Sequence, residues 1–329
     1  MGVINRAHFL WMVLAMAAIM SHQAASLRAQ GAAQDWEKAA GGTQEFEVAS
    51  VRENKDDGPR SSNLVLDSPN AYYTVHKNDA LAPAGTLFSA KNQTLMRYIV
   101  FAYKLSGMQE LALRFDSYSG LKQRVPEWVK NDRYNIEARA SGTATTDQMR
   151  LMMQGLLADR FNLVVHWETR EAPVFALVLD KPGKPGPQLE PHPVTDDCTA
   201  DRHGDPADGT ASLAVLPIPC GIITRVSAAA QGGMHFAGRN VTLAMLADSL
   251  PTQTGLVTLP RPLIDKTGLE GRYNLMLAWT PEDTSEVNNR ETGGTFLAAL
   301  KDQLGLRLKP ETAPVQILVI DRVEQPSPN

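Results

Sequence analysis

The stretch Phe88-Ser-Ala-Lys-Asn-Gln-Thr-Leu95 occurs a second time, in altered form, as Phe236-Ala-Gly-Arg-Asn-Val-Thr-Leu243. Two further pairs of similar stretches follow in the same order: Arg133-Tyr-Asn-Ile136 with Arg272-Tyr-Asn-Leu275, and Ala172-Pro-Val174 with Ala313-Pro-Val315. Three matches in one order and at similar spacing predict two homologous halves. A solenoid would instead show a shorter period, repeated at least three times.

Each half shows the same order of elements. Apolar residues at the helical period predict a helix after each Asn-x-Thr, with Thr94 and Thr242 as N-caps. The following elements are a strand (134–140 or 273–279), a helix (149–157 or 296–304) and two strands (162–169 and 174–179, or 306–309 and 315–320). Pro173 and Pro314 predict a turn between the last two strands, because proline cannot donate to an interior ladder.

These patterns predict an α+β fold built from two copies of a strand-helix-strand-helix-strand-strand module. Residues 46–51 supply the first strand of the first copy. We place the first module at residues 44–181 and the second at residues 232–324. Between them, residues 182–231 are rich in Pro and Asp and predict a linker or a long surface loop.

Residues 1–29 have the features of a secretory signal peptide. Arg6 precedes an apolar run over residues 9–20, and small residues follow at Ala24, Ala25 and Ala29. The run is shorter than the roughly 20 residues that span a bilayer, although an uncleaved anchor remains the alternative. We therefore expect an exported protein, periplasmic or extracellular, without a stable membrane span after cleavage.

The charge excludes one class of partner. The formal net charge is −4, and cleavage would remove Arg6 and Arg28 but no acid. A chain without excess positive charge is not expected to bind nucleic acid through a basic surface.

Export gives a meaning to the two cysteines of the chain, Cys198 and Cys220. An oxidising compartment favours a disulfide between them, which would pin the linker. In the chain-entropy model, closing a loop of about twenty residues stabilises by roughly 3 kcal/mol. A catalytic thiol is the alternative, but no Cys-x-x-Cys or local Cys/His signature accompanies either cysteine.

The sequence carries no recognised motif for catalysis, cofactor binding or metal binding. The chain has no His-Glu-x-x-His helix, no Gly-x-Ser-x-Gly elbow and no phosphate-binding glycine loop. Several linker residues could ligate a cation in principle: His192, Asp196, Asp197, Asp201, His203 and Asp205. We favour a solvated acidic linker, because metal sites need their ligands fixed. Likewise, His166 fits the polar face of a strand better than a catalytic base.

Three aromatic residues are candidate binding contacts. Tyr134 and Tyr273 recur at matched positions of the two halves, and Trp128 lies in the unmatched stretch Pro126-Glu-Trp128. Core packing is the competing interpretation for all three. The sequons at Asn92 and Asn240 are better explained as duplicated residues at a helix start than as glycosylation sites.

With these residues in view, the chain resembles an exported, soil-associated protein family of unknown function that is expanded in Acidobacteria of the Solibacter type. The matching segments are Phe46-Glu-Val-Ala-Ser-Val51, Pro126-Glu-Trp128, Arg133-Tyr-Asn-Ile136, Leu156-Leu-Ala-Asp-Arg-Phe161, Glu168-Thr-Arg-Glu-Ala-Pro-Val174, Asp265-Lys-Thr-Gly-Leu269, Gly271-Arg-Tyr273, Leu304-Gly-Leu306, Ala313-Pro-Val315 and Val319-Ile-Asp321. Related domains are appended to BlaR-type sensor metallopeptidases, but this chain has no protease motif. The resemblance implies no catalytic residues.

The order of elements is also similar to the short N-terminal modules of secretins and TonB-dependent receptors, which are envelope interaction domains. Two hypotheses follow. The one that we favour is a non-enzymatic protein that binds an envelope protein or polysaccharide. The alternative is a hydrolase of extracellular polymers with an unrecognised carboxylate pair, because such pairs need only a suitable separation in space.

Overall fold

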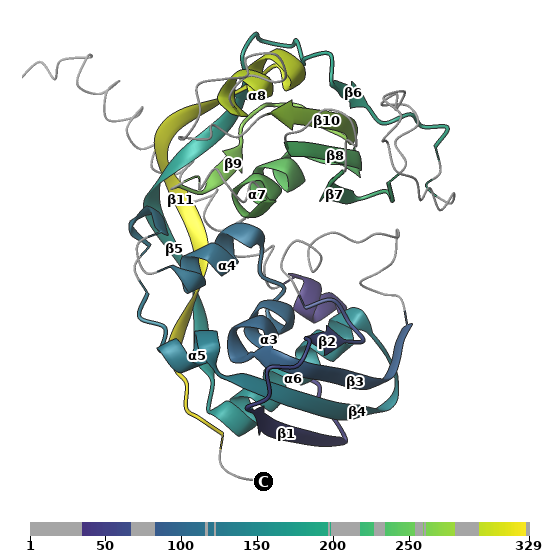
Figure 1. Cartoon of the computed structure of the whole chain (residues 1–329), viewed down its shortest axis with the longest axis vertical. Coiled ribbons are helices and arrows are strands. Elements are labelled where there is room, and N and C mark those ends of the chain that lie inside the picture. The colour runs from purple at the N-terminus through teal and green to yellow at the C-terminus, as the bar shows by residue number, and fades with distance from the viewer. Residues whose placement is uncertain are drawn as a thin grey trace, which may run out of the picture.

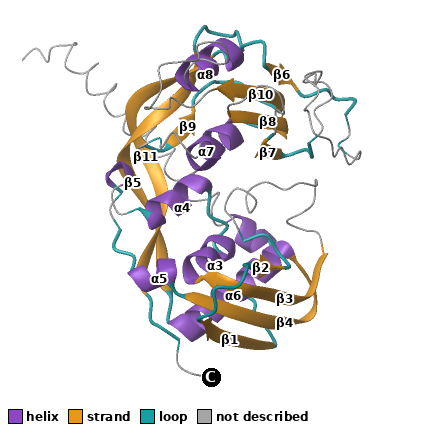
Figure 2. Ribbon diagram, in the orientation of Figure 1, coloured by secondary structure: helices purple, strands orange, loops and turns teal. Residues whose placement is uncertain are grey.

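The computed structural model describes residues 35–66, 83–115, 118–121, 123–196, 198, 218–226, 234–253, 259, 261–279 and 296–326. Over these residues the fold is α+β, as the sequence predicts, with helices packed on mostly antiparallel sheets (Figure 2). The predicted signal peptide lies outside the described residues. No helix within the described ranges is long and apolar enough to cross a membrane.

The first sheet has the strand order β1-β4-β3-β2. Its strands are β1 (Val48–Asn54), β2 (Ser61–Ser62), β3 (Pro83–Thr94) and β4 (Arg133–Thr145). Inward-facing residues of β4 alternate with exposed ones, as expected for a sheet with one covered face. Helices α3 (Leu95–Ala102), α5 (Glu127–Asn131) and α6 (Thr146–Phe161) contribute to the same hydrophobic core.

Helix α6 has clear sequence signals at both ends. Thr145 and Gln148 form a capping box at its N-terminus. At its C-terminus Asn162 adopts a left-handed conformation with φ of 47°. Met149, Met152 and Met153 of α6 are buried in the first core.

The second sheet has the strand order β6-β10-β8-β7. Its strands are β6 (Leu189–Pro191), β7 (Ile222–Arg225), β8 (Met234–Val241) and β10 (Tyr273–Trp279), and its helices are α7 (Leu243–Gln253) and α8 (Phe296–Leu304). Trp279 lies at the centre of this core, stacked on Phe236 at 5.2 Å and edge-on to Phe296 at 5.3 Å between ring centroids.

The expected linker, residues 182–231, is in part an element of the second sheet. It supplies both outer strands, because β6 pairs with β10 and β7 pairs with β8. The sequence pattern did not predict these strands, because they are only three and four residues long and lie in a segment rich in Pro and Asp.

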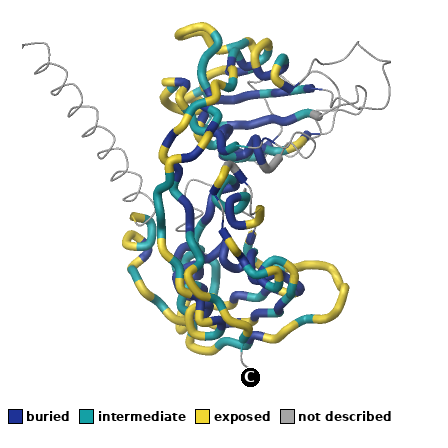
Figure 3. The backbone as a smooth tube through the Cα atoms, turned by 90° about the vertical axis from the view of Figure 1, so that its left-hand side faces the viewer, coloured by how far each residue is buried: buried dark blue, intermediate teal, exposed yellow. Residues whose placement is uncertain are grey.

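A long antiparallel ribbon joins the two sheets. It consists of β5 (Val164–Leu179) and β11 (Leu306–Arg322), and the short strand β9 (Leu263–Asp265) pairs in parallel with β5. Figure 1 shows the sheets at opposite ends of this ribbon. Leu318 of β11 is buried in the first core and Leu306 in the second. Figure 3 shows buried segments in both sheets and along the ribbon.

The predicted turns at Pro173 and Pro314 are wrong. Each proline lies within one continuous strand, Pro173 opposite Thr312 and Pro314 opposite Glu171. The pairs of strands predicted at 162–169 and 174–179, and at 306–309 and 315–320, are therefore single long strands. β11 is an outer strand of its sheet, and β5 pairs with β9 only over residues 175–177. Each proline therefore lies where its strand has one partner, and the missing N–H can face away from that partner.

Helix α4 (Gly107–Arg114) lies between the two sheets (Figure 1). It packs on β11, and the 3-10 turn η1 (Tyr118–Gly120) packs on β5. Ser106 caps α4. Asp248 of α7 reaches the same end of α4 and accepts the N–H groups of Gly107 at 2.9 Å and Met108 at 3.2 Å. A carboxylate at a helix N-terminus complements the helix dipole, so this contact ties α7 to α4.

Candidate functional site

The two tyrosines of the repeated stretches are buried. Tyr134 is buried and lies edge-on to Phe161, with the ring centroids 5.1 Å apart. Burial raises the pKa of Tyr134 to about 12. Tyr273 is also buried, and its hydroxyl donates to the Glu270 carbonyl at 3.1 Å. Trp128 of α5 is half-buried and packs against the first core. These positions favour core packing over ligand contact for all three residues.

The repeated asparagines have a shared role that the sequence did not reveal. Asn92 and Asn240 adopt positive φ angles of 58° and 55°. The backbone N–H of Asn92 donates to Asn135 Oδ1 at 2.7 Å, and that of Asn240 donates to Asn274 Oδ1 at 3.0 Å. Asparagine is among the few residues that adopt this conformation routinely. The matched Asn-x-Thr and Arg-Tyr-Asn stretches thus meet across neighbouring strands.

The threonine caps are confirmed in one copy only. Thr242 Oγ1 accepts the N–H of Met245 at 3.2 Å. Thr94 stands at the N-cap position of α3 but makes no capping hydrogen bond with its side chain.

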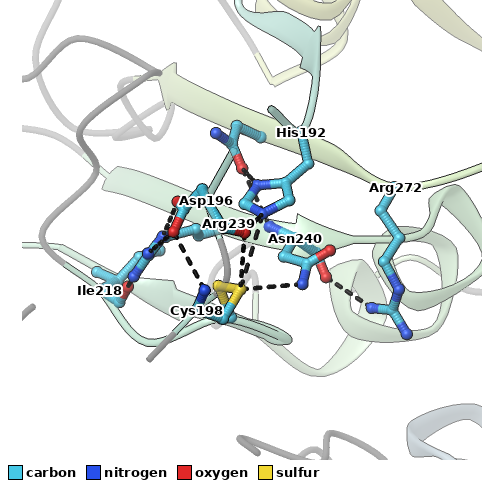
Figure 4. Close-up of a disulfide and its surroundings, with 9 residues drawn as sticks. His192, Asp196, Cys198, Ile218, Arg239, Asn240 and Arg272 are labelled. Carbon is cyan, nitrogen blue, oxygen red and sulfur yellow. Dashed lines mark hydrogen bonds and ion pairs between the residues drawn. A yellow bond between two sulfur atoms is a disulfide. The ribbon is translucent and has the colours of Figure 1, made fainter. Parts of the chain in front are cut away.

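The predicted disulfide Cys198–Cys220 is present (Figure 4). Residues next to both cysteines contact the same buried arginine, Arg239 of β8. Arg239 makes a bidentate ion pair with Asp196, at 2.6 and 3.0 Å, and donates to the Ile218 carbonyl at 3.1 Å. The Arg239 side chain is 1% exposed and that of Asp196 9%, so water screens this pair little.

His192 joins the same network from the end of β6. Its Nδ1 lies 2.9 Å from Asn274 Oδ1, and its Nε2 lies 3.2 Å from the Asp196 carbonyl oxygen and 3.7 Å from Cys198 Sγ. Asn240 Nδ2 donates to the same sulfur at 3.1 Å. The expectation of a solvated acidic linker is therefore wrong for His192 and Asp196, because the pairing of β6 with β10 fixes them. Asp197, Asp201, His203 and Asp205 lie outside the described residues.

A groove of about 410 Å³ lies on the first module, between the start of β1 and the second half of α6. Residues 45–49 form one wall, and Gly155, Leu156, Asp159 and Arg160 form the other. β1 is one of the two outer strands of its sheet within the described residues. Alternate backbone N–H and C=O groups of an edge strand point away from its neighbour and can pair with an added strand.

The groove carries more acids than bases. Glu45, Glu47 and Asp159 line it together with one base, Arg160. All three acids are exposed, and the Asp159 side chain is 76% exposed beside the Arg160 guanidinium at 3.2 Å. Val48 adds an exposed apolar side chain at 59%. The wall of the groove therefore offers backbone, apolar and acidic contacts next to one another. No sequence motif marked this place, since its two walls lie about a hundred residues apart along the chain.

Comparison with known proteins gives one match. A family model described as "Protein of unknown function (DUF3738)" matches residues 97–323. Neither a curated protein nor a solved structure matches the chain.

Proposed function

The chain belongs to the DUF3738 family, whose function is unknown, and we propose that it is an exported, non-enzymatic binding protein that holds an extended segment of an envelope protein along β1. One observation carries the proposal: an outermost strand borders an acidic groove that a helix closes from the other side. Peptides that add a strand to a sheet gain affinity from main-chain hydrogen bonds and specificity from alternate side chains. Here the acidic wall selects a segment with basic side chains.

Strand length favours the first module over the second as the site. β1 has seven residues, whereas β6, the outer strand in the corresponding place of the second sheet, has three. The corresponding strand orders, β1-β4-β3-β2 and β6-β10-β8-β7, and the matched asparagine pairs support our interpretation of the sheets as two copies of one module. We also propose that each copy resembles the short N-terminal modules of secretins and TonB-dependent receptors.

Export is part of the same proposal. The disulfide fits an oxidising compartment, such as the periplasm or the extracellular space. The apolar run at residues 9–20 supplies the expected signal peptide. The occurrence in soil bacteria and the link to BlaR-type sensors, which the family resemblance implies, belong to the proposal as well.

A peptide titration tests the binding function. The probes are fluorescent octapeptides in which Val alternates with Lys, Glu or Ser, and binding to the full chain is followed by anisotropy. The Lys peptide should bind at least about tenfold more tightly than the Glu peptide, and added salt should narrow the difference. Equal binding of the Lys and Glu peptides would contradict the proposal. If the protein bound no peptide but was retained on an envelope polysaccharide, its partner would be the polysaccharide and the proposal would be wrong.

Charge reversal at the groove provides the matched variants. Glu47→Lys and Asp159→Lys change exposed residues, so both variants should fold, and each should weaken Lys-peptide binding several-fold. Glu127→Lys is the control, because Glu127 is an exposed acid on α5, outside the groove lining, with a side chain 75% exposed. If all three substitutions weakened peptide binding equally, the effect would come from the overall charge of the protein and not from the groove, and the proposal would be contradicted.

The hydrolase alternative has one supporting observation, namely three carboxylates in one groove. The catalytic acid of such enzymes usually lies in a partly buried, apolar pocket, whereas these carboxylates are exposed. We therefore favour binding. Release of reducing sugars from an envelope polysaccharide, abolished by Glu47→Gln, would favour the alternative.

A further inference from the structure

We propose that reduction of the Cys198–Cys220 disulfide converts its surroundings into a zinc site, with the two thiolates and His192 as ligands and Asp196 as the fourth. One ligand atom from each of these four residues lies within 4.8 Å of every other. Two cysteines, a histidine and a carboxylate form a ligand set that suits Zn²⁺ in tetrahedral geometry. This inference concerns the second module and does not depend on the peptide groove.

The distance between nitrogen and sulfur suits a shared metal. In a tetrahedral site with Zn–S near 2.3 Å and Zn–N near 2.1 Å, these two ligand atoms lie about 3.6 Å apart. His192 Nε2 lies 3.7 Å from Cys198 Sγ. Cleavage of the S–S bond would let the two sulfurs separate to the roughly 3.8 Å that two thiolates on one zinc require.

The imidazole is already held in the orientation of a metal ligand. Asn274 Oδ1 accepts the backbone N–H of Asn240, so the atom that faces His192 Nδ1 is an acceptor and Nδ1 carries the proton. His192 Nε2 faces the Asp196 carbonyl oxygen and Cys198 Sγ, both of which are acceptors. In the neutral imidazole with its proton on Nδ1, the Nε2 lone pair is a third acceptor, and a cation between them would satisfy all three.

The charges of the cluster also balance. Arg239 and Asp196 neutralise each other in the buried network. Two thiolates offset the two positive charges of zinc, so loading the metal leaves the net charge of the cluster unchanged. The Asn240 Nδ2–H that donates to Cys198 Sγ would stabilise the thiolate. The Asp196 carboxylate also accepts the Cys198 N–H at 3.2 Å, and a carboxylate has about four lone-pair sites in all.

The step from disulfide to metal site takes two electrons. A dithiol reductant breaks the S–S bond by exchange through a mixed disulfide, becomes a disulfide itself and passes two protons to the protein sulfurs. Zinc then replaces these two protons. The disulfide is therefore the metal-free form and the dithiol the metal-binding form of one site.

Cobalt titration of the full chain tests the site. One sample stays oxidised. The other is reduced without oxygen by a water-soluble phosphine, which ends as its oxide with the oxygen and two protons supplied by water. The reduced chain should bind one equivalent of Co²⁺ with a thiolate-to-cobalt charge-transfer band, and Zn²⁺ should displace it. The oxidised chain should show no such band.

Two histidine variants separate the site from adventitious binding. His192→Ala should weaken Co²⁺ binding by the reduced chain at least about tenfold. His166→Ala is the control, because His166 lies on β5 with a half-exposed side chain, and it should change nothing. Zinc should also raise the melting temperature of the reduced chain and leave that of the oxidised chain unchanged.

Three results would overturn the proposal: a reduced chain without the charge-transfer band, equal binding by the parent and His192→Ala chains, or equal binding by the oxidised and reduced chains. Circular dichroism shows whether reduction unfolds the second module. If it does, addition of zinc should restore the fold, because a structural metal contributes its binding energy to folding. A reduced chain that stays unfolded with zinc would also overturn the proposal.

Discussion

Loss of Arg239 should destabilise the protein more than most single substitutions. Replacement by Met keeps the length of the side chain but leaves the Asp196 carboxylate, 9% exposed, without its bidentate partner and the Ile218 carbonyl without its donor. Removing one partner of a buried ion pair costs about 3–5 kcal/mol, because a desolvated charge remains. We expect Arg239→Met to lie in that range.

The first module supplies a control for this substitution. Lys91 occupies the position of Arg239 in the repeated stretch, but it is exposed on β3. Lys91→Met should therefore change stability by less than about 0.5 kcal/mol. Urea unfolding followed by circular dichroism gives both values. A double variant that also carries Asp196→Asn should be less destabilised than the sum of its single variants, because no charge remains to be desolvated.

If Arg239→Met costs no more than Lys91→Met, water reaches Asp196 readily and the ion pair contributes little to the stability of the protein, contrary to our expectation.

The remaining predictions concern the disulfide, a close backbone contact and a buried acid. The double variant Cys198→Ala, Cys220→Ala should lose about 3 kcal/mol in urea unfolding, because the disulfide spans 22 residues of sequence; an unchanged midpoint would contradict the entropic argument. Gly186→Ala should lower the melting temperature, because a Cβ there meets backbone atoms of Gln303 and Gly305, whereas Gly142→Ala meets nothing within 4 Å and should have a much smaller effect. Burial raises the pKa of Asp248, opposed by the N–H groups of Gly107 and Met108. Unfolded aspartate ionises near about pH 3.9, so from that pH up to the raised pKa the folded chain holds a proton that the unfolded chain has lost. The free energy of unfolding should therefore fall as pH rises through this window, and Asp248→Asn should remove this pH dependence. Urea unfolding from pH 3 upward measures it in both chains. An equal pH dependence in the parent and the variant would show that Asp248 is not its source.

Local patterns allowed part of the fold to be predicted. Helix α6 carries an apolar stripe at the helical period within its own residues, and the cysteine pair follows from composition and compartment. The ribbon was missed because Pro173 is a turn signal in isolation, and only the pairing with β11 shows that the strand continues. That pairing joins residues at least 127 positions apart, beyond the reach of any local pattern.

The candidate sites were hidden for the same reason. His192 reaches Asn274 only because β6 pairs with β10, and three strand residues among prolines give little periodicity to detect. The acidic groove joins residues 45–49 to α6 without a motif on either side. Conversely, the repetition of Tyr134 and Tyr273 made them candidate binding contacts, although both side chains are buried.

The ribbon also sets the order in which the chain can fold. Leu318 completes the first core, and the N–H of Glu324 donates to the Phe161 carbonyl at 2.7 Å, so the last residues of the second repeat finish the first module. A nascent chain that has emerged only as far as residue 181 lacks this strand and cannot close that core. Such contacts between distant parts of the sequence slow folding. The chain should therefore stay incompletely folded until its synthesis is almost complete, the state in which a protein can still be threaded through a membrane channel.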